Sequence, residues 1–171
     1  MMIRPETPAD YSAVYELNRV AFDGRDAEPR LVEAIRRAEG FIPELSLVAE
    51  EGGAVVGHIL FSPIIVAIDR GEVPALSLAP MAVRPDRQRR GIGSALVRHG
   101  LAECGRLGHR IVIVVGHAEF YPRFGFSSAL AQNLACPFGN CGEAWMALEL
   151  VPGALQGVWG TVKYPKAFDL V

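Results

Sequence analysis

This sequence of 171 residues has few cysteines, a small net charge and no long apolar run. The formal net charge is only -2, which excludes a chain that binds nucleic acid through its overall electrostatics. No apolar run reaches the ~20 residues that span a bilayer, and Arg4 and Glu6 interrupt the apolar start of a secretory signal. We therefore expect neither nucleic acid nor a membrane as a partner, and a cytoplasmic location.

The cysteines number three, Cys104, Cys136 and Cys141. An odd number in a chain expected to be cytosolic predicts free thiols. Cys136 and Cys141 lie five positions apart without a second pair, a poor match to the spacing of structural zinc ligands. We expect no metal site.

The remaining composition is that of an ordinary globular protein, with 50% hydrophobic and 21% charged residues. A chain of this length buries roughly 70% of its unfolded surface and fits one domain. No repeat, low-complexity stretch or linker divides the sequence. Residues 1–171 are therefore expected to fold as a single domain.

The first half of the chain predicts an edge strand, two helices and an antiparallel meander. Thr7, Pro8 and Asp10 are typical of a helix start, and a second helix is expected from about Glu28. Glycines at 52–53 and 71 predict turns between strands. The expected strands cover residues 2–4, 45–50, 54–61 and 73–83, and residues 64–69 are expected either to extend the strand at 54–61 or to follow it. Pro80 indicates a bulge or an edge, and a bulge would open a slot beside the strand.

The second half predicts helices over residues 92–107 and 118–124. A solid apolar run at 111–115 indicates a buried strand, and two closing strands are expected at 144–150 and 158–164. The strand–helix–strand pattern across 76–115 is typical of a crossover between parallel strands. The fold class is therefore α/β (α+β), with a mixed, mostly antiparallel central sheet flanked by helices.

Residues 88–96, QRRGIGSAL, carry the strongest functional pattern. Gly91 and Gly93 let the backbone approach a ligand closely. The predicted helix start adds unpaired N–H groups and the positive end of the helix dipole. Arg87, Arg89 and Arg90 add formal positive charge. This segment is predicted to bind a diphosphate.

That segment and residues 120–126, FYPRFGF, resemble the GNAT superfamily of acyl-CoA-dependent N-acetyltransferases. The cofactor motif of the family is glutamine or arginine, two residues, glycine, one residue, then glycine or alanine, and Gln88, Gly91 and Gly93 fill it. A second motif of the family, a tyrosine followed by Gly-Phe, is matched by Tyr121, Gly125 and Phe126. The resemblance implies a GNAT domain over residues 1–171, acetyl-CoA as co-substrate, and transfer of its acetyl group to a primary amine by direct attack.

The resemblance also implies roles for individual residues. Backbone groups at the end of strand 73–83 would pair with the pantetheine amides, and the N–H groups that follow would bind the diphosphate. The residues expected to bind the cofactor are Met81, Ala82, Val83, Gln88, Arg89, Arg90, Gly91, Ile92, Gly93 and Ser94. Tyr121 is the expected general acid, since a phenol of pKa about 10 protonates a thiolate of pKa about 8.5 at a cost of roughly 2 kcal/mol.

Three candidates remain for the general base: His117, Glu119 and a chain of water molecules. Gly116 and His117 stand where the family commonly has an asparagine that contacts the cofactor. The other histidines, His58 among them, have no constellation of functional residues around them in the sequence. The acceptor is expected to be a small-molecule or protein amine, and a homodimer is possible on family grounds.

Two other functions remain as alternatives. A nucleotide-binding oxidoreductase would use Gly91 and Gly93 as the start of a dinucleotide fingerprint, but Leu96 stands where its third glycine belongs. A non-catalytic acyl-CoA sensor or partner-binding domain on the same fold would keep both glycines and need no Tyr121.

Overall fold

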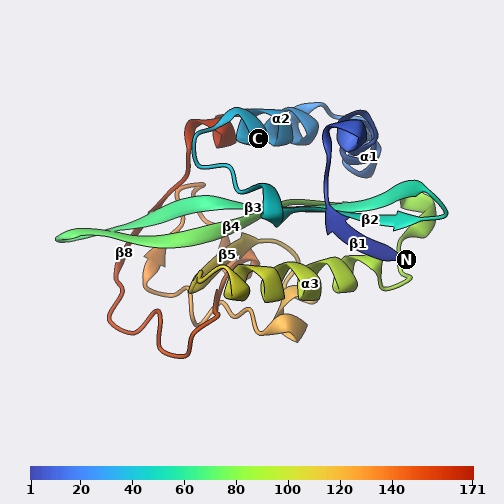
Figure 1. Ribbon diagram of the computed structural model, residues 1–171. Coiled ribbons are helices and arrows are strands. Elements are labelled where there is room, and N and C mark those ends of the chain that lie inside the picture. The colour runs from blue at the N-terminus through green and yellow to red at the C-terminus, as the bar shows by residue number, and fades with distance from the viewer. The chain divides into compact units, whose positions relative to one another are not determined.

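Eight strands and three α-helices form the fold, and the computed structural model describes the whole chain, residues 1–171. The strands are β1 (Met2–Pro5), β2 (Ser46–Glu51), β3 (Ala54–Ile68), β4 (Gly71–Val83), β5 (Ile111–Val115), β6 (Leu134–Ala135), β7 (Trp145–Glu149) and β8 (Gly160–Lys163). The helices are α1 (Tyr11–Ala21), α2 (Ala27–Arg37) and α3 (Ile92–Arg106), as Figure 1 shows. None of these helices is both long enough and apolar enough to cross a bilayer.

The strands are hydrogen-bonded in the order β1-β2-β3-β4-β5-β7, and β8 pairs with both β3 and β6. Antiparallel pairs join β1 to β2, β2 to β3, β3 to β8 and β5 to β7. Parallel pairs join β4 to β5 and β6 to β8. The expected mixed, mostly antiparallel sheet is confirmed, and so is the parallel pair on either side of the α3 crossover.

The structure decides one expectation left open and overturns another. Residues 64–69 extend the strand before them, because β3 runs unbroken to Ile68. The helix predicted over 118–124 is wrong, since only Tyr121–Phe124 form a 3₁₀ helix, which Gly125 ends at φ 101°. Pro122 explains this difference, because a proline inside a helix removes an N–H donor and clashes with the preceding turn.

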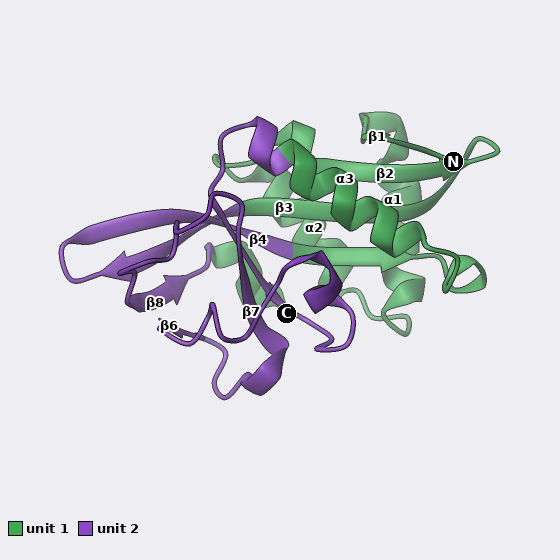
Figure 2. Ribbon diagram, turned by 90° about the horizontal axis from the view of Figure 1, so that it is seen from below, with its two compact units in different colours: residues 1–62, 79–103, 166–171 green, residues 63–78, 104–165 purple.

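The chain divides into two compact units, coloured separately in Figure 2. The first unit comprises residues 1–62, 79–103 and 166–171. In this unit α1 and α2 lie on one face of β1, β2 and β3, and α3 lies on the other (Figure 1). Apolar side chains on the buried helix faces, including Val14, Leu31 and Leu96, explain why these helices pack there.

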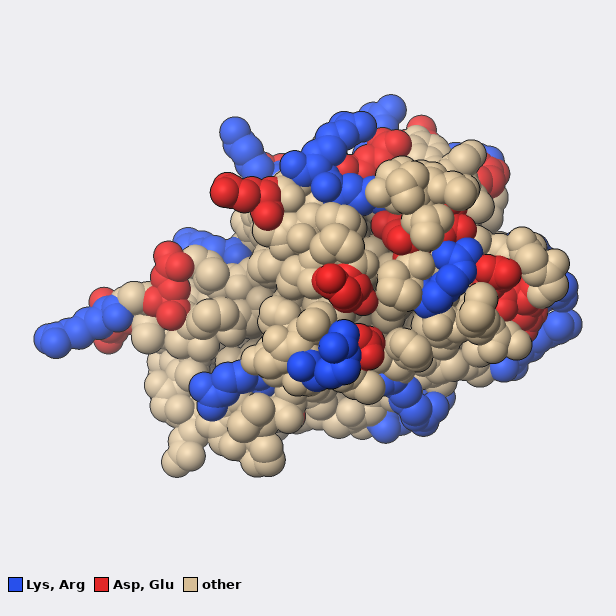
Figure 3. All heavy atoms as spheres, in the orientation of Figure 1, with Lys and Arg blue, Asp and Glu red and all other residues tan.

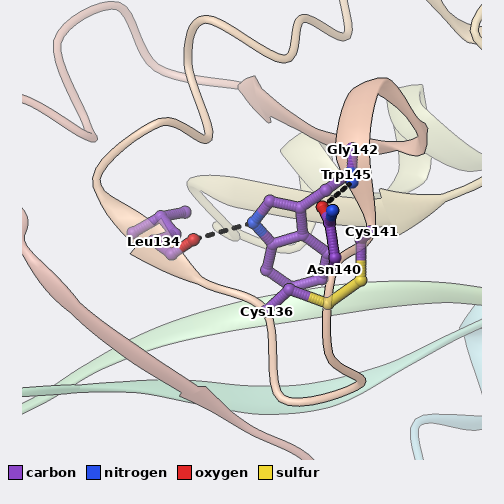
Figure 4. Close-up of a disulfide and its surroundings, with 6 residues drawn as sticks. All are labelled: Leu134, Cys136, Asn140, Cys141, Gly142 and Trp145. Carbon is purple, nitrogen blue, oxygen red and sulfur yellow. Dashed lines mark hydrogen bonds between the residues drawn. A yellow bond between two sulfur atoms is a disulfide. The ribbon is translucent and has the colours of Figure 1, made fainter.

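The second unit comprises residues 63–78 and 104–165. Its core contains Val66, Ile113, Trp145 and Val162, contributed by β3, β5, β7 and β8. The indole Nε1 of Trp145 donates a 2.8 Å hydrogen bond to the carbonyl of Leu134, which joins β7 to β6 (Figure 4). The four buried residues at the start of β5 explain its solid apolar sequence.

The prediction of free thiols is wrong for Cys136 and Cys141, which form a disulfide (Figure 4). The connection between β6 and β7 turns back at Gly139, whose φ is 92°. This turn brings the two Cα atoms to 6.6 Å, within the range that a disulfide spans. Sequence spacing did not show this approach because it depends on the turn. Cys104 is buried and forms no disulfide.

Candidate functional site

The predicted diphosphate site is the backbone of residues 88–94, which we call the cradle. The first helical hydrogen bond of α3 runs from the N–H of Ala95 to the carbonyl of Gly91 at 3.0 Å. The N–H groups of Ile92, Gly93 and Ser94 therefore precede every intrahelical acceptor and are available to an anion. The helix start predicted from the glycine pair is thus confirmed.

Gly91 is the residue that turns the chain into α3. Its φ is +82°, a left-handed conformation in which a side chain is strained, and it is exposed. A Cβ at this position would meet no atom of the protein within 4 Å. The open space beside a helix N-terminus fits a bound anion.

Two of the nearby arginines are already paired with acids. Arg84 contacts the Asp86 carboxylate at 2.6 Å, and Arg87 lies 3.5 Å from that of Glu51. Arg89 and Arg90 are exposed and form no ion pair within the protein, so they are the cations available to a phosphate. On the face shown in Figure 3, positive and negative side chains are interspersed.

The end of β4 supplies the other residues expected to contact the cofactor. Ala82 is buried, whereas Met81 and Val83 are half-buried. The Gln88 amide donates a 3.1 Å hydrogen bond to the carbonyl of Val83. Gln88 therefore holds the turn between β4 and the cradle, a structural role beside its expected place in the cofactor motif.

Sequence reasoning missed one residue that positions the cradle, Gly57 in β3. A Cβ on Gly57 would lie 2.9 Å from Leu96 Cδ1 and 3.0 Å from Ile92 Cγ2. The first turns of α3 thus pack directly against the strand backbone. An isolated glycine in a strand pattern indicates such a close approach, and this signal was present in the sequence.

Tyr121, the predicted general acid, lies in the second unit and is only 6% exposed. Its ring packs edge-to-face against Phe120 and Phe126, at 5.0 and 5.6 Å between centroids. Burial raises the pKa of Tyr121 to about 12. No side chain or carbonyl of the protein bonds its hydroxyl, so this group is a protonated donor at neutral pH with its hydrogen uncommitted.

His117 and Glu119, the candidates for the general base, are both exposed in the turn that leads to Tyr121. The His117 carbonyl accepts hydrogen bonds from the N–H groups of Phe120 and Tyr121, at 3.0 and 3.3 Å. The carbonyl of Glu119 accepts one from Arg123 at 3.3 Å. The backbone carbonyls of these two residues thus stabilise the turn, and their side chains remain accessible to solvent. The cradle belongs to the first unit and this turn to the second.

His58, which has no constellation of functional residues around it in the sequence, has polar partners in the fold. His58 is fully buried in the first unit, between β2 and α1. The Ser46 hydroxyl donates to Glu6 at 2.7 Å, so its oxygen accepts from His58 Nε2 at 3.0 Å. Arg36 closes this chain of polar groups with two hydrogen bonds to Glu6. The partners come from distant segments, which is why sequence inspection did not find them.

We expect the free energy of unfolding to fall as the pH is lowered from about 6.5 to about 4. Burial lowers the pKa of His58 from 6.5 to about 4 in the folded state. In this window the unfolded chain binds the extra proton, so acid favours unfolding, by roughly 3 kcal/mol at the lower end. Urea unfolding at a series of pH values measures the effect.

The matched variant for this prediction is His58→Gln, which keeps an N–H donor but cannot be protonated. Its stability should depend less on pH over the same window. Burial also lowers the pKa of His109, so a smaller slope of the same sign should remain. Equal slopes in the variant and the parent would show that His58 is not the titrating group.

Known proteins are similar to this chain over most of its length. The family model described as the Acetyltransferase (GNAT) domain matches residues 2–129. YhbS of Escherichia coli K12, described as an uncharacterized N-acetyltransferase, is 35% identical over 170 residues, which is 99% of each chain. YjhQ of the same strain, described in the same way, is 40% identical over 121 residues, covering 69% of this chain and 65% of YjhQ.

Two solved structures are similar over nearly the whole chain. The structure of YhbS from E. coli in complex with CoA has a TM-score of 0.89 at 32% identity, covering 98% of this chain and 91% of that one. A GNAT family acetyltransferase from Brucella melitensis in complex with acetyl-CoA has a TM-score of 0.79 at 34% identity, with coverages of 98% and 97%. The family model, the relative matched over its full length and these structures show that this chain belongs to the GNAT acetyltransferase family.

Proposed function

We propose that this protein transfers the acetyl group of acetyl-CoA to a primary amine by direct attack, within a single domain formed by residues 1–171. The observation that carries the proposal is the cradle, where Gly91 in a left-handed conformation leaves open space beside the N–H groups that begin α3. Similar proteins crystallised with CoA and with acetyl-CoA support the choice of co-substrate.

The residues present fit the two ends of such a co-substrate. The N–H groups of residues 89–94 would hold the diphosphate, with Arg89 and Arg90 supplying charge. The backbone of Met81, Ala82 and Val83 would pair with the pantetheine amides as an added strand. Acetyl-CoA itself supplies an electrophilic thioester carbonyl. Holding amine and thioester together can remove roughly 7–11 kcal/mol of the barrier, so positioning contributes more than any single proton transfer.

Tyr121 is proposed to protonate the departing sulfur. With the pKa of the phenol raised to about 12, the gap to a thiol of about 8.5 corresponds to roughly 5 kcal/mol in water, more than an unburied tyrosine would face. Burial also raises the pKa of a thiol, so the pKa difference between the phenol and the thiol is smaller when the sulfur lies in the same apolar surroundings. The uncommitted hydroxyl can donate a hydrogen bond to the sulfur as its charge develops.

The general base is proposed among His117, Glu119 and bound water, since both side chains are exposed beside the tyrosine turn. The acceptor is proposed to be a small-molecule or protein amine. A homodimer stays a prediction drawn from the family resemblance.

A panel of amines tests the proposal, with release of free CoA thiol from acetyl-CoA as the readout. We expect at least one class among polyamines, amino acids, aminoglycosides and peptide N-termini to raise thiol release well above hydrolysis without amine. Mass spectrometry of the product should show one added acetyl group. Binding of acetyl-CoA without turnover of any amine would favour the acyl-CoA sensor instead.

A further inference from the structure

The Tyr121 ring is held entirely by packing, because no polar group of the protein bonds its hydroxyl. Phe120 and Phe126 contact the ring edge-to-face, with interplanar angles of 88° and 78°. Two rings at nearly right angles to a third restrict its tilt. The direction of the hydroxyl therefore depends on the neighbours of the ring rather than on a hydrogen bond.

Gly116, just beyond β5, provides the third contact. A Cβ built on Gly116 would overlap Cε2 of Tyr121 and would lie 2.8 Å from Cδ2 and 3.3 Å from Cζ. The ring thus lies directly on the backbone of Gly116. Any side chain at this position would displace the ring from its place.

The backbone of Gly116 gives no other reason for glycine. Its φ lies outside the left-handed region, so an alanine could adopt the same conformation. Its N–H donates a 3.0 Å hydrogen bond to the carbonyl of Ala144, which fixes the segment at the start of β7. The three atoms nearest to a built Cβ all belong to Tyr121, so the missing side chain is what lets the ring pack here.

We propose that Gly116, Phe120 and Phe126 form a seat for Tyr121 that aims its hydroxyl at the leaving group, which makes Gly116 a positioning residue. The inference rests on the proposed function, in which Tyr121 donates the proton. All the residues of the seat belong to the second unit. An ångström-scale shift of the ring would not change the chemistry of the phenol, but its O–H would no longer point at the leaving sulfur.

The test is Gly116→Ala, assayed with an amine identified in the panel. We expect kcat to fall about 10- to 100-fold, as misplacement by about 1 Å can cause, while KM for acetyl-CoA changes by less than about threefold. Gly105→Ala is the matched control, because a Cβ on Gly105 would meet no atom within 4 Å and its φ is not left-handed. Its kcat should equal that of the parent.

Repeating the substitution in a Tyr121→Phe protein shows whether Gly116 acts by positioning Tyr121 or by a general effect on the structure. In a Tyr121→Phe protein, Gly116→Ala should lower kcat by less than about twofold further, because the effects of two substitutions that act through one group are not additive. An equal loss in both backgrounds, or an unchanged kcat in Gly116→Ala alone, would overturn the seat. Full activity of Tyr121→Phe would instead refute the proposed acid, and a panel without any turnover would refute both.

Phe120→Leu keeps the test decisive if Gly116→Ala does not fold. Phe120 is half-buried, so leucine removes the edge contact with less risk to the core. We expect kcat to fall about three- to tenfold in the parent and to stay constant in the Tyr121→Phe background. An unchanged kcat in the parent would contradict the seat.

Discussion

Gly91→Glu is expected to weaken acetyl-CoA binding by at least about 100-fold, to the point where calorimetry detects no heat. A non-glycine residue at φ +82° is strained by roughly 1–2 kcal/mol. A carboxylate about 4 Å from one phosphate charge adds repulsion of roughly 4 kcal/mol at an effective dielectric constant of 20. The strain lowers the stability of the free and the bound protein alike, whereas the repulsion acts only on the complex. Each 1.4 kcal/mol is about tenfold in affinity, so the repulsion alone exceeds the stated loss.

Gly108→Glu is the matched control for this result. Gly108 has a similar φ of +89° and equally open surroundings, but it follows the C-terminus of α3 rather than its start. We expect it to cost stability through the same backbone strain and to bind acetyl-CoA as the parent does. Undiminished affinity in a folded Gly91→Glu protein would refute the cradle as the diphosphate site.

Tyr121→Phe is expected to lower kcat by at least about 100-fold, the lower range for loss of a general acid. Phenylalanine keeps the edge-to-face contacts with Phe120 and Phe126, so the fold and the Kd for acetyl-CoA should change little. Removing the hydroxyl leaves the departing sulfur without its proposed donor. Steady-state kinetics with the best amine of the panel, together with calorimetry on acetyl-CoA, measure both quantities.

Tyr164→Phe serves as the control, because Tyr164 is the other tyrosine whose pKa is raised by burial in the second unit. Its hydroxyl is hydrogen-bonded to Ser77, so its loss should reduce stability by about 1 kcal/mol and leave kcat unchanged. Equal activity of Tyr121→Phe and the parent would show that the proton comes from elsewhere, with water as the first alternative.

Sequence pattern predicted the parts of the site that are local in the chain. The glycine pair, the following apolar spacing and the arginines lie within a few residues of one another, and their consequences for α3 arise from backbone geometry alone. The crossover around α3 followed from the same reasoning, since a strand, a helix and a second buried strand have few arrangements. The helix predicted over 118–124 failed where Pro122 opposed the apolar pattern.

Most of the elements, the start of α3 after the glycine pair and the family could be predicted from the amino-acid order, because each depends on residues that are neighbours along the chain. Other contacts depend on the path of the folded chain: Ser46 with buried His58, Gly57 with α3, and, only five positions apart, the ring of Tyr121 with Gly116. The disulfide between Cys136 and Cys141 likewise depends on a turn that brings two Cα atoms to 6.6 Å. Such contacts follow from packing and chain reversal, which no local spacing encodes.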